Sequence, residues 1–400
     1  MGATSFERHL RESAVRKETL DRFLDPDTDT WATFDPDCGY RLKRFMPRDG
    51  IDGSYTISTS APSTARTAVN YVHVPRRLNT YGDSFTQCHQ VSDGETWQEY
   101  LAAHLGEPIG NFGMGGYVVY QAYRRMVRTE ATGEGRPYVL LYLWGDDHLR
   151  SILRCRHAVI YTWWENSGDM FHNPFWSNVE MNLETGALEE HDNRLRTPES
   201  LYRMTDPDFM YASLRDDLMA QLYLYVHADI DGIDRQAAVR LAEVLGVPAP
   251  DLGRSRDQNL AAVDRLMWEY GFAATRHLVR KSAEWAARSG KRIMYVVFCP
   301  RALREQLVTG SRYDQPLVDF FGSSGLDWFD MTPVHVADYA AFRCGIDAYL
   351  ERYFIGHYSP AGNHFFAFAI KDRIVEWLDP KPITYLAGQE RVIRFHGYLR

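Results

Sequence analysis

The run Tyr-Val-Leu-Leu-Tyr-Leu-Trp at residues 138–144 decides the fold of this chain. An uninterrupted apolar run of this length is typical of a β-strand buried on both faces, because a strand with one solvated face alternates apolar and polar residues. A second run of this kind occupies residues 292–298, after a long stretch with helical periodicity near 259–289. Strand, helix and strand in this order predict parallel strands joined by crossover helices.

Shorter segments on either side of these runs extend the same alternation of strands and helices. We expect further strands at 77–81, 108–112 and 326–330, and further helices at 95–105, 118–128 and 361–377. The predicted fold class is therefore α/β, with a central parallel sheet and helices on both of its faces.

Three other segments do not follow this alternation of strands and helices. Residues 1–75 begin with a helical pattern over 4–24 and continue as an irregular, partly β extension. Residues 151–258 form an insertion, predicted as a β-hairpin over 175–191 and helices, between the two parts of the α/β domain at 76–150 and 259–380. Residues 381–400 are a C-terminal tail. Ligands of parallel sheets bind at the carboxyl ends of the strands, so we expect the insertion to form one wall of a ligand-binding site at that edge.

Composition excludes several classes of protein. The 400 residues are 45% hydrophobic and 24% charged, which excludes a disordered or collagen-like chain. The net charge of −8 argues against a nucleic-acid partner. We expect no membrane span and no secretory leader, and the scattered cysteines, without a CxxC pair, favour reduced thiols in a cytoplasmic protein. The oligomeric state is left open.

The most informative short motif is Tyr-Gly-Asp-Ser-Phe-Thr at residues 81–86, directly after a predicted strand. A serine on a sharp turn from strand to helix is exposed at the edge of the sheet, beside free backbone N–H groups of the helix start. Ser84 is thus a candidate nucleophile. Alternatively, the segment is only a helix cap. The motif does not match the G-x-S-x-G turn of α/β-hydrolases.

Three further segments accompany this motif in order: Asn-Phe-Gly-Met-Gly-Gly-Tyr at 111–117, Leu-Trp-Gly-Asp-Asp-His at 143–148 and Gly-His-Tyr-Ser-Pro-Ala-Gly-Asn-His at 356–364. Together the four segments resemble the conserved blocks of the SGNH (GDSL-type) hydrolases. The resemblance covers roughly 77–150 and 291–378, and it implies a flavodoxin-like three-layer α/β/α sandwich. It also implies that Ser84 is the nucleophile, that His357 is the general base, and that Ser84, Gly116 and Asp146 form the oxyanion site.

The chain departs from the family pattern at two positions. Asp146 stands where the family has an oxyanion-binding asparagine, although a shift of one residue would place Asp147 there. An ionised carboxylate would repel an oxyanion, so Asp146 must be protonated, point elsewhere or mark altered chemistry. The acid that usually precedes the histidine is also missing. Asp330 and Glu351 are candidate substitutes, a backbone carbonyl is another, and Asp83 is a further, less certain member of the site.

The function expected from this resemblance is a serine hydrolase that cleaves a carboxylic ester of a small or medium organic molecule, as an esterase or deacetylase. The alternatives are an acyltransferase that uses the same acyl-enzyme, and a binding protein of this fold with impaired catalysis. We expect no cofactor and no metal. Aromatic pairs at 163–164 and 175–176 belong either to a substrate platform or to the core. Nearby arginines either bind an anionic substrate or line a solvated face; these are Arg150, Arg154 and Arg156.

Overall fold

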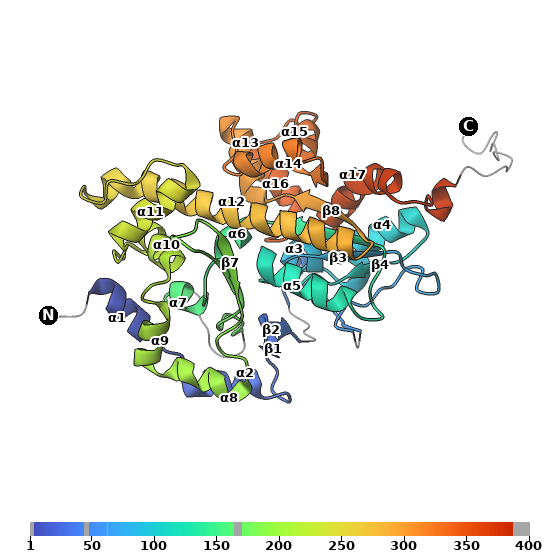
Figure 1. The fold of residues 1–400 in the computed structure, drawn as a ribbon. Helices are drawn as coiled ribbons and strands as arrows, with labels where there is room; N and C mark the ends of the chain where they lie inside the picture. Colours follow the sequence, from blue (N-terminus) through green and yellow to red (C-terminus); the bar gives the residue numbers. More distant parts are fainter. Residues whose placement is uncertain (1–3, 44–47, 62, 164–169, 387–400) are drawn as a thin grey trace, which may run out of the picture.

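The computed structural model of the chain describes residues 4–43, 48–61, 63–163 and 170–386 (Figure 1). At its centre lies a sheet of five parallel strands in the order β4-β3-β5-β8-β9. The strands are β3 (Leu78–Tyr81), β4 (Ile109–Asn111), β5 (Tyr138–Leu143), β8 (Arg292–Val297) and β9 (Asp327–Asp330). The prediction of an α/β protein with a central parallel sheet is confirmed, and the predicted strands lie within a few residues of those observed.

The middle strand β5 shows why its sequence is apolar throughout. It pairs with β3 on one side and β8 on the other, and all of its residues are buried. Val139, Leu141 and Leu143 join one hydrophobic core, whereas Leu140 and Tyr142 join a second core on the opposite face of the sheet. A strand that serves two cores has no face for polar residues.

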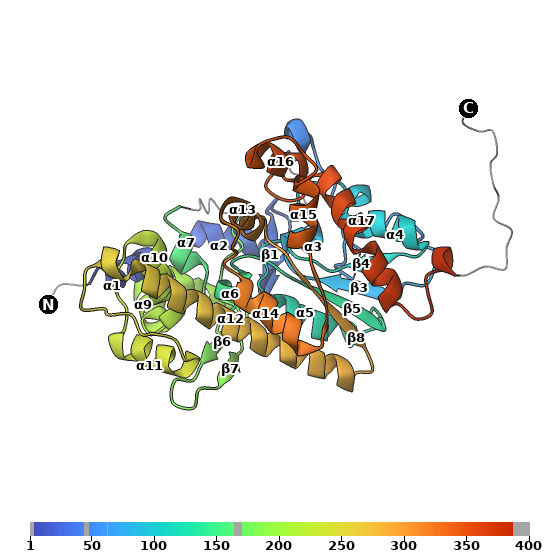
Figure 2. The same ribbon diagram turned by 90° about the horizontal axis from the view of Figure 1, so that it is seen from above.

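Helices cover both faces of the sheet, as Figures 1 and 2 show. Helices α4 (Trp97–Leu105) and α17 (Pro360–Trp377) pack together on one face, and α5 (Val119–Glu130) and α12 (Arg256–Arg288) contact each other on the opposite one. The arrangement is compatible with a three-layer sandwich. The chain returns through α13 (Pro300–Thr309), α14 (Gln315–Ser324), α15 (Thr332–Tyr339) and α16 (Ile346–Tyr353).

The N-terminal extension differs from the prediction in one respect. The single helix predicted over 4–24 is wrong, because the chain forms α1 (Ser5–Glu12) and α2 (Lys17–Leu24) with a break between them. At this break the N–H of buried Val15 binds the carbonyl of Met204 in the insertion instead of a carbonyl of its own helix. A short antiparallel pair follows, β1 (Ala32–Asp35) with β2 (Gly39–Leu42).

The insertion contains the predicted hairpin, β6 (Asn178–Met181) with β7 (Leu188–His191), and several helices. These are α7 (His157–Ile160), α8 (Pro198–Leu201), α9 (Pro207–Leu214), α10 (Leu218–Ala228) and α11 (Arg235–Leu245), and the short helix α6 (Asp147–Arg150) directly precedes the insertion. The long helix α12 runs from this part of the molecule to the sheet (Figure 1). In the tail, residues 387–400 lie outside the described residues.

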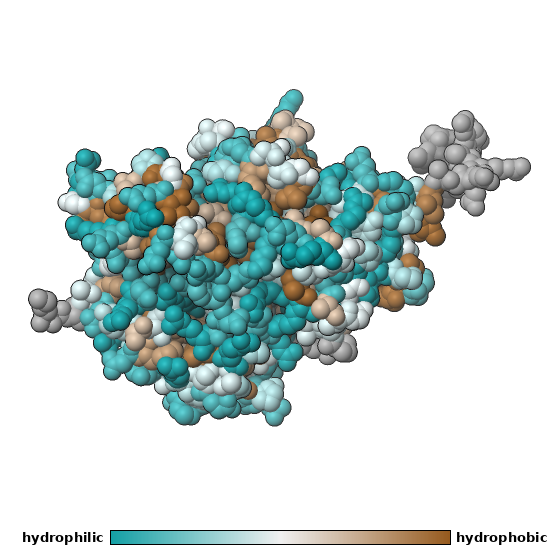
Figure 3. Space-filling view, viewed as in Figure 1, coloured by the Kyte–Doolittle hydropathy of each residue, from teal (hydrophilic) through white to brown (hydrophobic). Residues whose placement is uncertain are grey.

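The surface seen in Figure 3 is largely hydrophilic, with apolar side chains in small, scattered groups. None of the helices in the described part of the chain combines the length and apolar character that a membrane-spanning helix needs.

Candidate active site

The motif at 81–86 forms a tight turn between β3 and the short helix α3 (Ser84–Gln87). Gly82 has φ +154°, and a Cβ atom there would lie 2.2 Å from Thr86 Oγ1, so only glycine allows so close an approach. Asp83 is the helix cap, because its carboxylate accepts the N–H groups of Phe85 and Thr86. Ser84 is therefore not the cap, and its N–H, at the first helical position, has no acceptor within the helix.

Ser84 meets His357, which lies 273 residues away in the sequence. The Nε2 atom of His357 lies 2.8 Å from Ser84 Oγ. The histidine comes from the loop between α16 and α17, and its ring packs against the rings of Phe85 and His89. Burial lowers the pKa of His357 to about 4, so its imidazole is neutral at physiological pH and can accept a proton.

Gln90 contacts His357 at the ring nitrogen that does not contact Ser84. Its Oε1 atom accepts two hydrogen bonds, from the Nδ1 atom and from the backbone N–H of His357, both of 2.8 Å. Because an amide oxygen only accepts, Nδ1 carries the hydrogen and Nε2 presents its lone pair to Ser84. Gln90 Nε2 donates to the carbonyl of Asp49 at 3.1 Å, which fixes the orientation of the amide.

Sequence reasoning missed Gln90, although Gly356 carried a weak signal. A Cβ atom on Gly356, whose φ is +108°, would lie 2.7 Å from Gln90 Oε1. The glycine before the histidine therefore makes room for the amide. The candidate substitutes do not reach His357: Asp330 pairs with Arg312 at 2.5 Å, and Glu351 is exposed on α16.

Gly116 lies in the loop between β4 and α5 and lines the same cavity as Ser84. Its φ is +77°, and within the described part of the chain its N–H has no acceptor. The Tyr40 hydroxyl donates to the carbonyl of Gly115 at 2.8 Å. Since the C=O and N–H of one trans peptide point in opposite directions, this bond fixes the direction of the Gly116 N–H.

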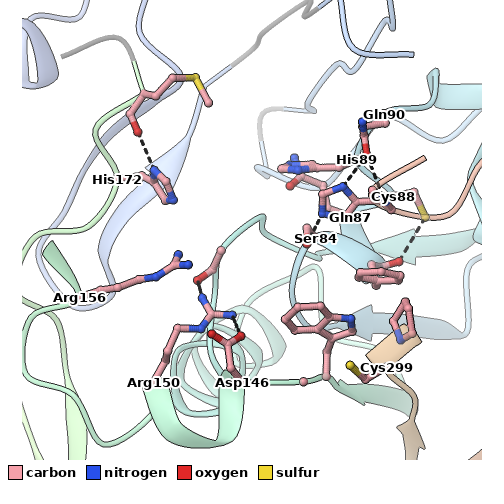
Figure 4. A pocket seen from close by; sticks show the side chains of 18 of the residues that line it. Ser84, Gln87, Cys88, His89, Gln90, Asp146, Arg150, Arg156, His172 and Cys299 are labelled. Carbon is pink, nitrogen blue, oxygen red and sulfur yellow. Dashed lines mark hydrogen bonds and ion pairs between the residues drawn. The ribbon is translucent and has the colours of Figure 1, made fainter. Parts of the chain in front are cut away.

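The carboxylate of Asp146 is directed toward Arg150. The residue stands at the N-cap position of α6 without a capping hydrogen bond from its side chain, and its carboxylate lies 3.1 Å from the guanidinium of Arg150 (Figure 4). Burial acts to raise the pKa of Asp146, but Arg150 and Arg156 outweigh burial and hold it below its ordinary value. The carboxylate is thus ionised and paired.

The two neighbouring carboxyl groups, Asp147 and Asp83, are buried behind Ser84. Asp147 pairs with the same Arg150 guanidinium, which also donates to the carbonyl of Gly116 at 3.0 Å. Burial raises the pKa of Asp83 to about 7, and burial together with the charge of Asp83 raises the pKa of Asp147. Arg150 thereby connects this acidic cluster with the loop that carries Gly116.

Ser84, His357 and Gln90 line a cavity of about 930 Å³, whose other walls come from the N-terminal extension, the carboxyl edge of the sheet and the insertion. Of the two alternatives for the arginines, a solvated face is wrong for Arg150 and Arg154, which are only 4% and 7% exposed. Arg154 pairs with Glu180 and Asp216, whereas Arg150 and Arg156 line the cavity.

The aromatic pairs of the insertion divide between cavity and core. Trp163 lines the cavity, and Phe175 and Trp176 are buried in the core. Trp164 lies outside the described residues. Among the described residues, no group of three or more histidine, cysteine or acidic side chains is placed to hold a metal ion.

Comparison with known proteins adds no further assignment. Neither a family model nor a curated protein matches this chain.

Proposed function

We propose that this protein is a serine hydrolase of the SGNH type that cleaves a carboxylic ester through a Ser84 acyl-enzyme. The observation that carries the proposal is the chain of hydrogen bonds from Ser84 through His357 to Gln90, each 2.8 Å long. Nucleophile, base and an orienting group in this relation are the arrangement that activates a serine hydroxyl.

In the proposed first half-reaction, Ser84 Oγ attacks the ester carbonyl carbon while its proton passes to His357 Nε2. The carbonyl oxygen becomes an oxyanion, for which the N–H groups of Ser84 and Gly116 are the proposed donors. When the tetrahedral intermediate collapses, the bond to the alcohol breaks and the alcohol takes the proton from His357. In the second half-reaction, a water oxygen attacks the acyl carbon while the water proton passes to the same nitrogen. The bond between the acyl carbon and Ser84 Oγ then breaks, Oγ takes the proton back from His357, and the acid is released.

Gln90 is proposed to orient the base without adding charge to it. Its amide fixes the tautomer of His357, as a carboxylate would, but it does not attract the imidazolium that forms in the transition state. Tyr40 and Arg150 are positioning residues, since they bind the carbonyls on either side of the Gly116 α-carbon. The ion pair with Arg150 offsets the charge of Asp146, which supports catalysis despite the missing asparagine.

The size of the cavity supports a small or medium substrate, because sites for such molecules have volumes of about 300–1,000 Å³. Its walls come from three parts of the chain and enclose the serine. Such enclosure also favours acyl transfer to an alcohol or amine, if the acceptor enters and water does not.

The test is the intact-protein mass after treatment with a fluorophosphonate. Wild type should gain a single adduct, and Ser84→Ala and His357→Ala should gain none at the same dose. A panel of p-nitrophenyl esters then measures hydrolysis, and added alcohols or amines reveal acyl transfer by diverting the product. A folded wild-type protein that takes up no label would overturn the proposal and favour the binding protein.

A further inference from the structure

We propose that the substrate of this site carries an anionic group, a carboxylate or a phosphate, which Arg301 and Arg156 bind in the part of the cavity next to the insertion. The inference rests on the proposed ester hydrolysis and names the substrate class. It concerns residues that take no part in the proposed chemistry.

Arg301 is the stronger part of the evidence. It follows β8 and lies in the first turn of α13, and it lines the cavity. Its guanidinium lies over the rings of Trp268 and Tyr313, with its central carbon 5.2 and 4.8 Å from their centroids. Within the described part of the chain, no hydrogen bond or ion pair engages it. Contact with two aromatic rings restricts the guanidinium, and its N–H groups remain available to a carboxylate or phosphate.

Arg156 supplies a second positive charge. It extends from the insertion into the cavity in Figure 4, and its Nη1 atom lies 3.5 Å from Asn173 Oδ1. Burial and the nearby charge of Arg150 lower the pKa of Arg156 to about 10. A guanidinium in such surroundings is poorly solvated, and an anionic ligand would offset that cost.

Among the described residues, the carboxylates of the cavity wall do not pair with Arg301. In the described part of the wall the acidic residues are Asp49 and Asp146. Asp146 is paired with Arg150, and Asp49 belongs to the extension, where its carboxylate accepts the hydroxyl of Thr56. Aromatic side chains form much of the remaining wall, namely Trp31, Trp144, Trp163, Tyr223 and Trp268. The fitting substrate is therefore an ester with an apolar body and one anionic end.

The test compares two esters of equal chain length, mono-p-nitrophenyl glutarate, which ends in a carboxylate, and p-nitrophenyl valerate, which ends in a methyl group. We expect kcat/KM to be at least tenfold higher for the glutarate. Arg301→Met should bring the ratio close to one and leave valerate hydrolysis unchanged, and Arg301→Lys should retain part of the preference. Arg304→Met is the matched control, because Arg304 lies on the same helix and pairs with exposed Asp347 outside the cavity.

Binding is measured separately from turnover, by thermal shift with phenyl phosphate and with phenylacetate. Stabilisation of wild type that is lost in Arg301→Met supports the proposal even if neither ester is cleaved, a result that would refute only the esterase function. The stronger of the two ligands distinguishes phosphate from carboxylate. Equal rates for both esters together with equal binding by wild type and Arg301→Met would overturn the proposal and leave ester hydrolysis standing.

Discussion

Replacing Gln90 with glutamate would give His357 the carboxylate partner that it lacks. Nδ1 lies 2.8 Å from Gln90 Oε1, which would place a carboxylate directly against the ring. Two unit charges centred about 4 Å apart attract by about 4 kcal/mol at an effective dielectric constant of ~20, which corresponds to about 3 pKa units. The pKa of His357, lowered to about 4 by burial, would then approach 7.

One contact of Gln90 opposes this rise. The amide nitrogen donates to the carbonyl of Asp49, and the second oxygen of glutamate would face that carbonyl without a hydrogen. The repulsion raises the pKa of the new carboxyl group and weakens its pull on the ring, so we expect a net rise of about 1–3 units for His357.

The assay is the pH dependence of kcat/KM for a neutral p-nitrophenyl ester between pH 5 and pH 9. The base works in its neutral form, so activity is lost as the pH falls through its pKa. Wild type should keep most of its activity down to pH 5. Gln90→Glu should lose at least half of its own plateau between pH 7 and pH 5.

Gln90→Ala separates charge from orientation. It removes the acceptor without adding a carboxylate, so activity should still persist to pH 5, but the plateau should fall by about 10²-fold or more because the ring loses its fixed tautomer. If folded Gln90→Glu has the same pH profile as wild type, Gln90 does not face the catalytic ring and the reasoning fails.

Three further predictions concern residues that orient the site and histidines that affect the stability of the fold. Tyr40→Phe removes the hydroxyl that binds the Gly115 carbonyl, and it should lower kcat about tenfold with little change in KM; an unchanged kcat would contradict a positioning role. Gly116→Ala places a Cβ atom 2.6 Å from the Tyr40 hydroxyl at φ +77°, so both kcat and Tm should fall, and a fully active variant would exclude Gly116 from the oxyanion site. Burial lowers the pKa of His157 to about 4 and of His335 to about 3, below the value of about 6.5 in the unfolded chain. At these two side chains the unfolded state therefore binds more protons below pH 6.5, and their contribution to the free energy of unfolding should fall by roughly 2–3 kcal/mol per pH unit near pH 5; a pH dependence of urea unfolding that stays the same when both are replaced with glutamine would refute it.

The sheet could be predicted because its signal is local. Residues 138–143 are apolar at every position, and this pattern directly reports the two cores that β5 serves. The break between α1 and α2 could not be predicted in this way. It depends on a hydrogen bond from Val15 to Met204, which lies far away in the sequence.

In the candidate site, too, only the residues with a local sequence signal could be predicted. The motif around Ser84 and the segment around His357 carry recognisable patterns, and the structure brings these two residues together. Gln90 carries no such pattern, since a glutamine in a loop is common and its partner lies 267 residues later. The burial of Arg150 could not be predicted, because a charged residue usually lies at the surface, whereas Arg150 is held in the interior by two aspartates.

The N-terminal extension supplies two of the contacts that orient the site, through the hydroxyl of Tyr40 and the carbonyl of Asp49. A chain trimmed to its α/β part, as is often done to improve expression, would keep the serine, the histidine and the sheet beneath them. It would lose the Tyr40 hydroxyl, which orients the peptide between Gly115 and Gly116, and the Asp49 carbonyl, which binds the amide of Gln90. Such a truncated protein could fold and still be inactive, so assays of this chain require its first fifty residues.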